Sequence, residues 1–286
     1  MLAPTASAVH DEDFELDGNT ASTAGGVQDV DWEDLFTEPD KSKTGVGNAP
    51  VPVASLPGDH TVATFIEDWE IKANGDFDTS DPTTYTTGAK DIGEVNTWRC
   101  VGANNVTNKG DLTNVYATIV NTDTQTFIYF GAEKTEDNGD NNIGIWLLQG
   151  SATCPTPATG NGNAFVGTHA DGDIFLVSAF TNGGGVSNIT AYAWSTDLDG
   201  DDIHNENADD VGLDGEPIAV SADCVLSVSN PNFDDRLCAT TNTQATKTPA
   251  THDPEWSHYS KQFGVNGGIE RSTFFEGGIE ITGFDQ

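Results

Sequence analysis

The amino-acid sequence predicts an all-β protein, built as a large antiparallel β-sandwich or jelly roll of the lectin-like kind. Between residues 109 and 194, short runs rich in aliphatic and aromatic residues alternate with loops of Gly, Asn, Asp and Thr. Runs of this kind, bounded by turn-forming residues, are typical of β-strands. The apolar spacing of long amphipathic helices is missing from the sequence. Both observations favour sheets throughout the main body.

Individual strands can be assigned within this region in chain order. Residues 127–130, 143–148 and 174–180 are apolar at successive positions, which predicts central strands covered on both faces. Residues 186–194 alternate more cleanly, as expected for a strand whose side chains point to opposite faces in turn. The glycines at 183–185 predict a tight hairpin connection between the last two of these strands.

The chain has 286 residues, enough for one large all-β domain with additional segments or for two smaller domains. Its 46 acidic and 11 basic residues give a formal net charge of −35. Such a surface repels nucleic acid and anionic lipid, and no apolar run is long enough to insert into a membrane. The charge indicates a solvated surface adapted to salt or to the cell exterior. Dedicated Ca²⁺ sites on some carboxylates are a compatible second interpretation.

Four cysteines, Cys100, Cys154, Cys224 and Cys238, allow three disulfide pairings. Cys224 and Cys238 flank a loop short enough to be closed by a local bridge, which leaves Cys100 to pair with Cys154. No cysteine lies in a CxxC pair or in a Cys/His cluster with zinc spacing, so a zinc site is disfavoured. Two disulfides predict an oxidising compartment, and the alternative is four reduced thiols in a cytosolic protein.

The first sixty residues differ in composition from the rest. Residues 1–8 end in the small-x-small pattern Ala6-Ser7-Ala8, and we interpret them as the remnant of a secretory signal. The alternative is a small-residue tail without a targeting role, because a basic start and a long apolar run are both missing. Residues 9–60 are acidic and rich in Gly and Pro, which predicts an irregular segment. Its apolar patches at 14–19 and 32–36 are expected to dock on the main body, as an edge strand or a short helical turn.

Several motifs resemble those of a family of secreted bacterial surface proteins of the actinobacterial type. They follow one another in the order found in that family: FELDGN (14–19), DWEDL (31–35), KGDLTNVYA (109–117), IYFGAEKTEDNGDNNIGIWLL (128–148), GDIFLVSAFTNGG (172–184) and FFEGGIEIT (274–282). The resemblance implies secretion, display at the cell exterior and attachment to further β-rich modules of a longer parent chain. It supplies no catalytic residues. Family members continue past the last motif, which implies that the β-sandwich domain predicted for 61–286 is truncated at its C-terminus.

The best candidate for a metal site is the acidic loop that begins at Asp197. Asp197, Asp199 and Asp201 occupy alternate positions, and Asp209 follows later in the loop. Carboxylates spaced in this way can converge on one Ca²⁺ ion, which prefers six to eight oxygen ligands. The loop resembles the DxDGD loops of thrombospondin type 3 repeats, but it lacks the glycine and glutamate of an EF-hand. A solvated acidic loop is the alternative interpretation.

Aromatic side chains supply a second, weaker candidate site. Trp256 and Tyr259 lie in the polar, proline-containing segment HDPEWSHYSK and are predicted to be an exposed pair that could bind a ligand such as a glycan. Trp146 and Trp194 lie inside predicted strands and are expected in the core. Exposed single aromatics are common in proteins, so this pair alone does not establish a binding site.

The sequence shows no assembled catalytic constellation. Neither an HExxH pair nor a GxSxG turn is present. Asp68 with Glu70, and Glu276 with Glu280, are the nearest approach to the carboxylates of a sandwich-type glycosidase. The first pair lacks a third member. The glycines between Glu276 and Glu280 indicate a bulge or close strand packing instead.

The sequence therefore predicts a non-enzymatic module at the cell surface or outside the cell, with a structural or adhesive role. Surface glycans or other surface proteins are the expected partners, and Ca²⁺ is the only expected cofactor. A lectin-like carbohydrate-binding module is the alternative function, and a glycan hydrolase is less favoured.

Overall fold

The computed structural model places most of the predicted strand regions and parts of the segments between them. The residues that it describes are 9, 14–22, 30–37, 49–69, 77–78, 92–100, 110–137, 141–155, 162–181, 185–197, 212–221, 223–224, 236–242, 254 and 256–282.

The first sheet has five antiparallel strands in the order β1-β3-β4-β14-β11. Their bounds are β1 His60–Glu67, β3 Leu112–Asn121, β4 Thr126–Lys134, β14 Phe274–Glu280 and β11 Leu237–Thr241. β14 is buried at every position because it lies inside the sheet and both of its faces are covered.

The second sheet has the order β10-β8-β7-β5, and the short β9 also pairs with β8. The bounds are β10 Ala219–Ser221, β8 Gly185–Ser195, β7 Ile174–Thr181, β5 Asn141–Leu147 and β9 Gly212–Leu213. β7 and β8 pair antiparallel, as the predicted hairpin requires. β5 is the last strand of this sheet in the described part of the chain, so the prediction of a central strand at 143–148 was wrong. Its outward-facing Trp146 packs instead on the ring of His169.

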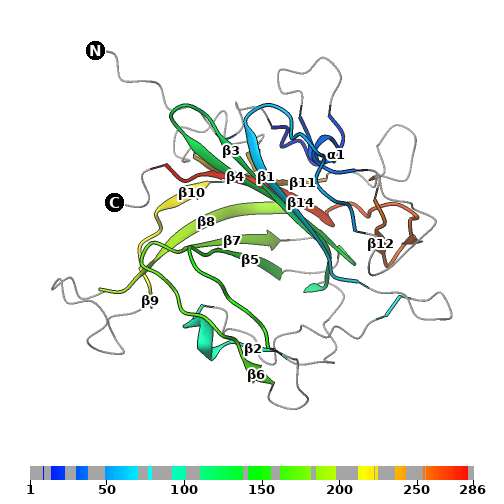
Figure 1. The fold of residues 1–286 in the computed structure, drawn as a ribbon. Coiled ribbons are helices and arrows are strands. Elements are labelled where there is room, and N and C mark those ends of the chain that lie inside the picture. The colour runs from blue at the N-terminus through cyan, green and yellow to red at the C-terminus, as the bar shows by residue number, and fades with distance from the viewer. Residues whose placement is uncertain are drawn as a thin grey trace.

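The two sheets form a half-barrel (Figure 1). β11, the last strand of the first sheet, lies against β8 and β10 of the second, which joins the sheets on that side. On the other side the sheets end separately, at β1 and at β5. The predicted all-β class and antiparallel pairing are confirmed. Among the described residues, no helix is long and apolar enough to cross a membrane.

A first hydrophobic core lies between the sheets. It contains Phe130, Leu176 and Phe275, with Ile189 and Ile279. All five are buried.

Glycines allow the large rings of β4 to lie flat against the neighbouring strand. Gly277 and Gly278 pair with Phe130 and Tyr129. A Cβ atom added at Gly277 would lie 2.8 Å from Phe130 Cε2, and one at Gly278 would lie 2.7 Å from Tyr129 Cδ1. Contacts this short are not tolerated, so the glycines between Glu276 and Glu280 serve close strand packing, one of the two predicted explanations.

A second hydrophobic core lies on the outer face of the first sheet, under the N-terminal segment. We call the described residues of 9–37 the N-terminal cover. Phe14, Trp32 and Leu35 of this cover are fully buried. The helix α1, Trp32–Leu35, forms because Asp31 caps its first turn and Asp34 completes a capping box. Of the two forms expected for the patch at 32–36, the structure has the short helical turn, and residues 14–22 dock without forming a strand.

The outer face of the second sheet has its own covering, which we call the disulfide cover. It contains the 3₁₀ turn η1, Val95–Thr97, and the strand pair β2, Arg99–Cys100, with β6, Asn163–Ala164. Figure 1 shows β2 and β6 on the side of the second sheet that faces away from the first. A further strand pair, β12 at Tyr259–Ser260 and β13 at Gly264–Val265, lies near the C-terminal end.

Candidate functional site

A cavity of about 650 Å³ opens between the two sheets, on the side where the half-barrel is not closed. β1 and β5, the two terminal strands on that side, both contribute to its wall. The lining residues are Val62, Thr64, Ala117, Thr118, Ile119, Thr126, Ile128, Trp146, Leu147, Leu148, Gln149, Gly172, Ile174, Ile281 and Thr282.

The pleat of the first sheet explains why the lining residues of β1, β3 and β4 lie on the same face. Successive side chains of a strand point to opposite faces, so every second residue of β1, β3 and β4 faces the second sheet. Near β1 this inner face is not covered by any described strand, because the second sheet ends at β5. Val62 is consequently 52% exposed and Ile66 is 57% exposed, although both are aliphatic.

The lining is mostly aliphatic and contains no charged side chain. The lining residues with polar side-chain groups are Thr64, Thr118, Thr126, Trp146, Gln149 and Thr282. Some of these groups already have partners: Thr126 N donates to Thr282 Oγ1 at 2.8 Å, and Gln149 Nε2 donates to Asp171 O at 2.6 Å. A concave, mostly apolar site with a few fixed polar groups suits an apolar ligand or side chain held in a defined orientation.

Behind this wall, the ring of His169 lies among tryptophans. Its centroid is 4.2 Å from that of Trp146 and 4.2 Å from that of Trp194, and the Trp98 ring packs edge-on at 5.4 Å. Trp98 comes from the disulfide cover, so this cover and the cavity wall share one aromatic cluster. Trp194 is buried, as predicted, whereas Trp146, on the terminal strand β5, is half-buried and is one of the residues that line the cavity.

Asp173 holds this cluster together. Its carboxylate accepts hydrogen bonds from Gln149 N at 2.8 Å and from Ala170 N at 3.0 Å, and its Oδ2 lies 3.0 Å from His169 Nδ1. A carboxylate can only accept, so Nδ1 of His169 carries the hydrogen of that contact. The other ring nitrogen, Nε2, is buried with no hydrogen-bond partner in the described part of the protein. The pair fixes the backbone at Gln149 and supports Trp146, but it does not line the cavity.

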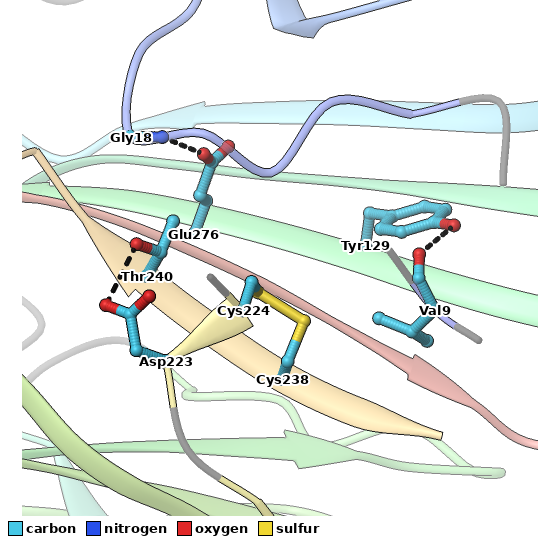
Figure 2. Close-up of a disulfide and its surroundings, with 8 residues drawn as sticks. All are labelled: Val9, Gly18, Tyr129, Asp223, Cys224, Cys238, Thr240 and Glu276. Carbon is cyan, nitrogen blue, oxygen red and sulfur yellow. Dashed lines mark hydrogen bonds between the residues drawn. A yellow bond between two sulfur atoms is a disulfide. The ribbon is translucent and has the colours of Figure 1, made fainter. Parts of the chain in front are cut away.

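On the opposite side of the first sheet, buried carboxylates hold the irregular segments in place. Glu276 of β14 accepts from Gly18 N at 2.6 Å through Oε1 and from the Trp32 indole at 2.9 Å through Oε2. Figure 2 shows the Gly18 contact beside the Cys224–Cys238 disulfide. Tyr129 adds a further attachment, because its hydroxyl donates to the backbone oxygen of Val9 at 3.1 Å (Figure 2).

A second carboxylate, Glu133 of β4, holds Trp256 in the same way. Glu133 Oε1 accepts from the Trp256 indole at 2.6 Å, and Oε2 accepts from Asn114 Nδ2 at 2.9 Å. Trp256 is only 1% exposed, so the prediction of an exposed ligand-binding pair with Tyr259 was wrong. Tyr259 is half-buried and stacks on Phe77, with 3.9 Å between the ring centroids. The sequence around Trp256 is polar and gave no sign of its burial, because its partner Glu133 lies far away in the sequence.

Burial governs the protonation of these groups. It raises the pKa of Glu276 well above the ordinary value, although the hydrogen bond from Gly18 opposes the shift. Burial, and then the nearby charge of Glu276, likewise raises the pKa of Asp31. At the free edge of the sheet, burial raises the pKa of Glu67 to about 7 and lowers that of His60 to about 4. The N-terminal cover is therefore attached to a face whose carboxylates resist ionisation.

The predicted calcium loop falls mostly outside the described residues. Asp197 is half-buried, and its backbone N–H donates to Ser195 Oγ at 3.1 Å. Asp199, Asp201 and Asp209 are not among the described residues. Within the described ranges, no group of three or more His, Cys, Asp or Glu side chains could hold a metal ion.

The structure contains the disulfides Cys100–Cys154 and Cys224–Cys238, the pairing that the sequence predicted. Two disulfides indicate folding in an oxidising environment. The first belongs to the disulfide cover, and the second lies in the core beneath the N-terminal cover.

Sequence reasoning missed the cavity and the His169–Asp173 pair. The pair had a weak local signal, because the two residues stand four apart in HADGD, at the entry to a predicted strand. The cavity had no local signal, since its lining comes from strands β1, β3, β4, β5 and β7 and from residues next to β5, β7 and β14.

Comparison with models of protein families finds no family that matches this chain. Comparisons with curated proteins and with solved structures find no match either. The resemblance to secreted bacterial surface proteins accordingly stays a prediction from the motifs.

Proposed function

We propose that this protein is a non-enzymatic, extracellular β-sandwich module of the jelly-roll kind, with an adhesive role at the cell surface. The observation that carries the proposal is the apolar cavity between β1 and β5, in a chain with a formal net charge of −35. A strongly charged protein does not gain solubility from an open aliphatic cavity, so the cavity has value as a contact site. Its partner is another molecule of the cell surface that presents an apolar group.

The two covers support this proposal by making the scaffold rigid. The Cys100–Cys154 disulfide stabilises the cover whose Trp98 packs near Trp146, and Asp173 fixes the backbone at Gln149. The N-terminal cover supports the first sheet from outside. A preformed site spends less free energy on ordering when it binds. The oxidising environment indicated by the disulfides agrees with a place outside the cell.

The carbohydrate-binding alternative has less support. Its predicted aromatic pair is lost, because Trp256 is buried against Glu133. Trp146 is the aromatic residue of the cavity wall, and its ring packs against those of His169 and Phe175. A glycan array, run with the wild type and with Trp146→Ala, separates the two functions. Sugar binding that Trp146→Ala abolishes would favour the alternative.

The direct test is a fluorescence titration with Nile red, an uncharged apolar dye that brightens on leaving water. We expect saturable binding that Thr64→Phe weakens by about tenfold, because the added ring occupies the cavity. Thr64 is exposed on β1, so the variant should fold normally. Val220→Phe is the matched control, since Val220 is exposed on β10, away from the cavity. Dye binding that is absent, or equal in Thr64→Phe and the wild type, would refute the proposed contact site.

Calcium stays a prediction from the acidic loop at Asp197. If it stabilises the module, chelation by EDTA lowers the melting temperature, because a ligand bound only by the folded state raises stability. An unchanged melting temperature would remove calcium from the proposal.

A further inference from the structure

The edge of the first sheet offers a second kind of contact beside the cavity. β1 is the terminal strand of its sheet within the described residues, and it is eight residues long. Natural sheets usually protect such edges with lysines, prolines or bulges. β1 has the sequence HTVATFIE, with no Lys or Pro, and its register shift lies at its start, between His60 and Val62. Most of the strand is therefore suited to pairing with another strand.

The hydrogen-bond register shows which backbone groups are available. Asp68 N donates to Thr113 O at 2.7 Å, which makes these two residues a hydrogen-bonded pair. Such pairs recur at every second residue of an antiparallel ladder, so Ile66, Thr64 and Val62 also direct their backbone groups toward β3. The N–H and C=O groups of the intervening residues, Ala63, Phe65 and Glu67, point away from the sheet.

The side chains of β1 define what an added strand would cover. Val62 and Thr64 line the cavity, and Ile66 continues the same exposed face. A strand added to β1 would extend the first sheet toward β5, on the open side of the half-barrel. The inward side chains of that strand would cover the aliphatic face, so aliphatic residues are expected at every second position.

The charges near β1 indicate which charge an added strand should carry. Asp59 and Asp68 are exposed at the two ends of β1, and Glu67 stands on the face away from the cavity. Opposite charges on neighbouring strands attract, and like charges repel. A second copy of this chain is a poor occupant, because two molecules that each carry −35 repel one another.

We propose that β1 is a docking edge for an extended, cationic polypeptide segment, with aliphatic residues alternating with Lys or Arg. The segment pairs with the outward backbone groups of Ala63, Phe65 and Glu67, and its aliphatic side chains enter the cavity. This inference rests on the proposed adhesive role and names the chemistry of the partner. The binding mode is strand addition, in which main-chain hydrogen bonds supply affinity and side-chain pockets supply specificity.

The test uses a blocked, fluorescently labelled peptide that alternates Lys and Val over the length of β1, measured by fluorescence anisotropy at low salt. We expect saturable binding that weakens as salt is added. Methylation of every second peptide nitrogen on the pairing side removes the main-chain donors and should weaken binding by about tenfold or more. A peptide with Glu in place of Lys should not bind.

Protein variants locate the site. Val62→Lys places a charge on the inner face of the edge and should weaken binding of the Lys–Val peptide by about tenfold. Val220→Lys is the matched control with the same change of charge on exposed β10, and it should bind like the wild type. Both residues are partly exposed, so circular dichroism should show folded variants.

Several results would overturn the inference. They are no peptide binding, equal binding by the methylated peptide, or equal loss in Val62→Lys and Val220→Lys. A dimer in sedimentation experiments that Val62→Lys dissociates would identify a second copy as the occupant. Because Nile red tests the cavity alone, dye binding without peptide binding refutes only the docking edge. Failure of both probes refutes the proposed function as well.

Discussion

The two covers of this protein are attached by different chemistry. In the disulfide cover, Cys100–Cys154 joins β2 covalently to the segment that follows β5, and the His169 ring beside this cover is held by Asp173. The described residues of the N-terminal cover are held by packing and hydrogen bonds, chiefly to Glu276 and Tyr129. The first attachment therefore responds to reduction, and the second responds to protonation of buried carboxylates. Each cover supports one wall of the half-barrel from outside, which leaves the space between β1 and β5 open.

The largest expected effect is on the N-terminal cover. Trp32 is fully buried and donates its indole hydrogen to Glu276, so Trp32→Ala leaves a void and an unpaired carboxylate oxygen. We expect the free energy of unfolding to fall by about 3–5 kcal/mol. Trp146→Ala, in the half-buried wall beside the disulfide cover, should cost about 2 kcal/mol. Denaturant unfolding measures both, and equal losses would contradict the different burial of the two tryptophans.

The disulfides should differ in their contribution. Cys100–Cys154 closes a segment of 54 residues and Cys224–Cys238 one of 14. In the chain-entropy description, the longer loop contributes about 4 kcal/mol and the shorter about 3 kcal/mol to stability. Paired Cys→Ser variants, unfolded by denaturant without reductant, measure each contribution. A greater loss for the Cys224→Ser/Cys238→Ser variant would show that the core beneath the N-terminal cover depends more on its disulfide than does the disulfide cover.

A smaller effect should appear in the pH dependence of the free energy of unfolding, and it comes from two groups at the edge of the first sheet. The pKa of Glu67 is raised from 4.5 to about 7, so its neutral form is favoured in the folded protein. The contribution of Glu67 to the free energy of unfolding is complete below pH 4.5 and is lost as the pH rises through about 7. The pKa of His60 is lowered from 6.5 to about 4, so its contribution is present above pH 6.5 and is lost as the pH falls through about 4.

The contributions of Glu67 and His60 to the pH dependence of stability partly cancel. The variant Glu67→Gln removes the first and so separates the two. Because Glu67 is half-exposed and screened by solvent, we expect the variant to gain about 1 kcal/mol over the wild type at neutral to alkaline pH. The two proteins should be equally stable in acid, where Glu67 is neutral. Thermal or denaturant unfolding across this range provides the measurement. Parallel stability curves for variant and wild type would show that Glu67 ionises as it does in water.

Local patterns predicted the strands and the disulfides well, but not the burial of individual polar-flanked residues. The continuous apolar runs around Phe130 and Leu176 are local features of the sequence, so they indicate strands without information from distant residues. Trp256 lies in a polar segment, and its partner Glu133 is 123 residues away, so its burial depends on the assembled sheet. Trp32 and Glu276 are separated by 244 residues. For the same reason, the open edge at β1 could not be recognised before the order of the strands was known.

Amide hydrogen exchange at single residues of β1 tests the open edge most directly. In the free protein, we expect fast exchange at Ala63, Phe65 and Glu67, which point away from β3, and slow exchange at Val62, Thr64 and Ile66. Addition of the Lys–Val peptide should slow the first group and leave the second unchanged. If the amides of the first group are already protected in the free protein, or stay unprotected when the peptide is bound, β1 is not a docking edge.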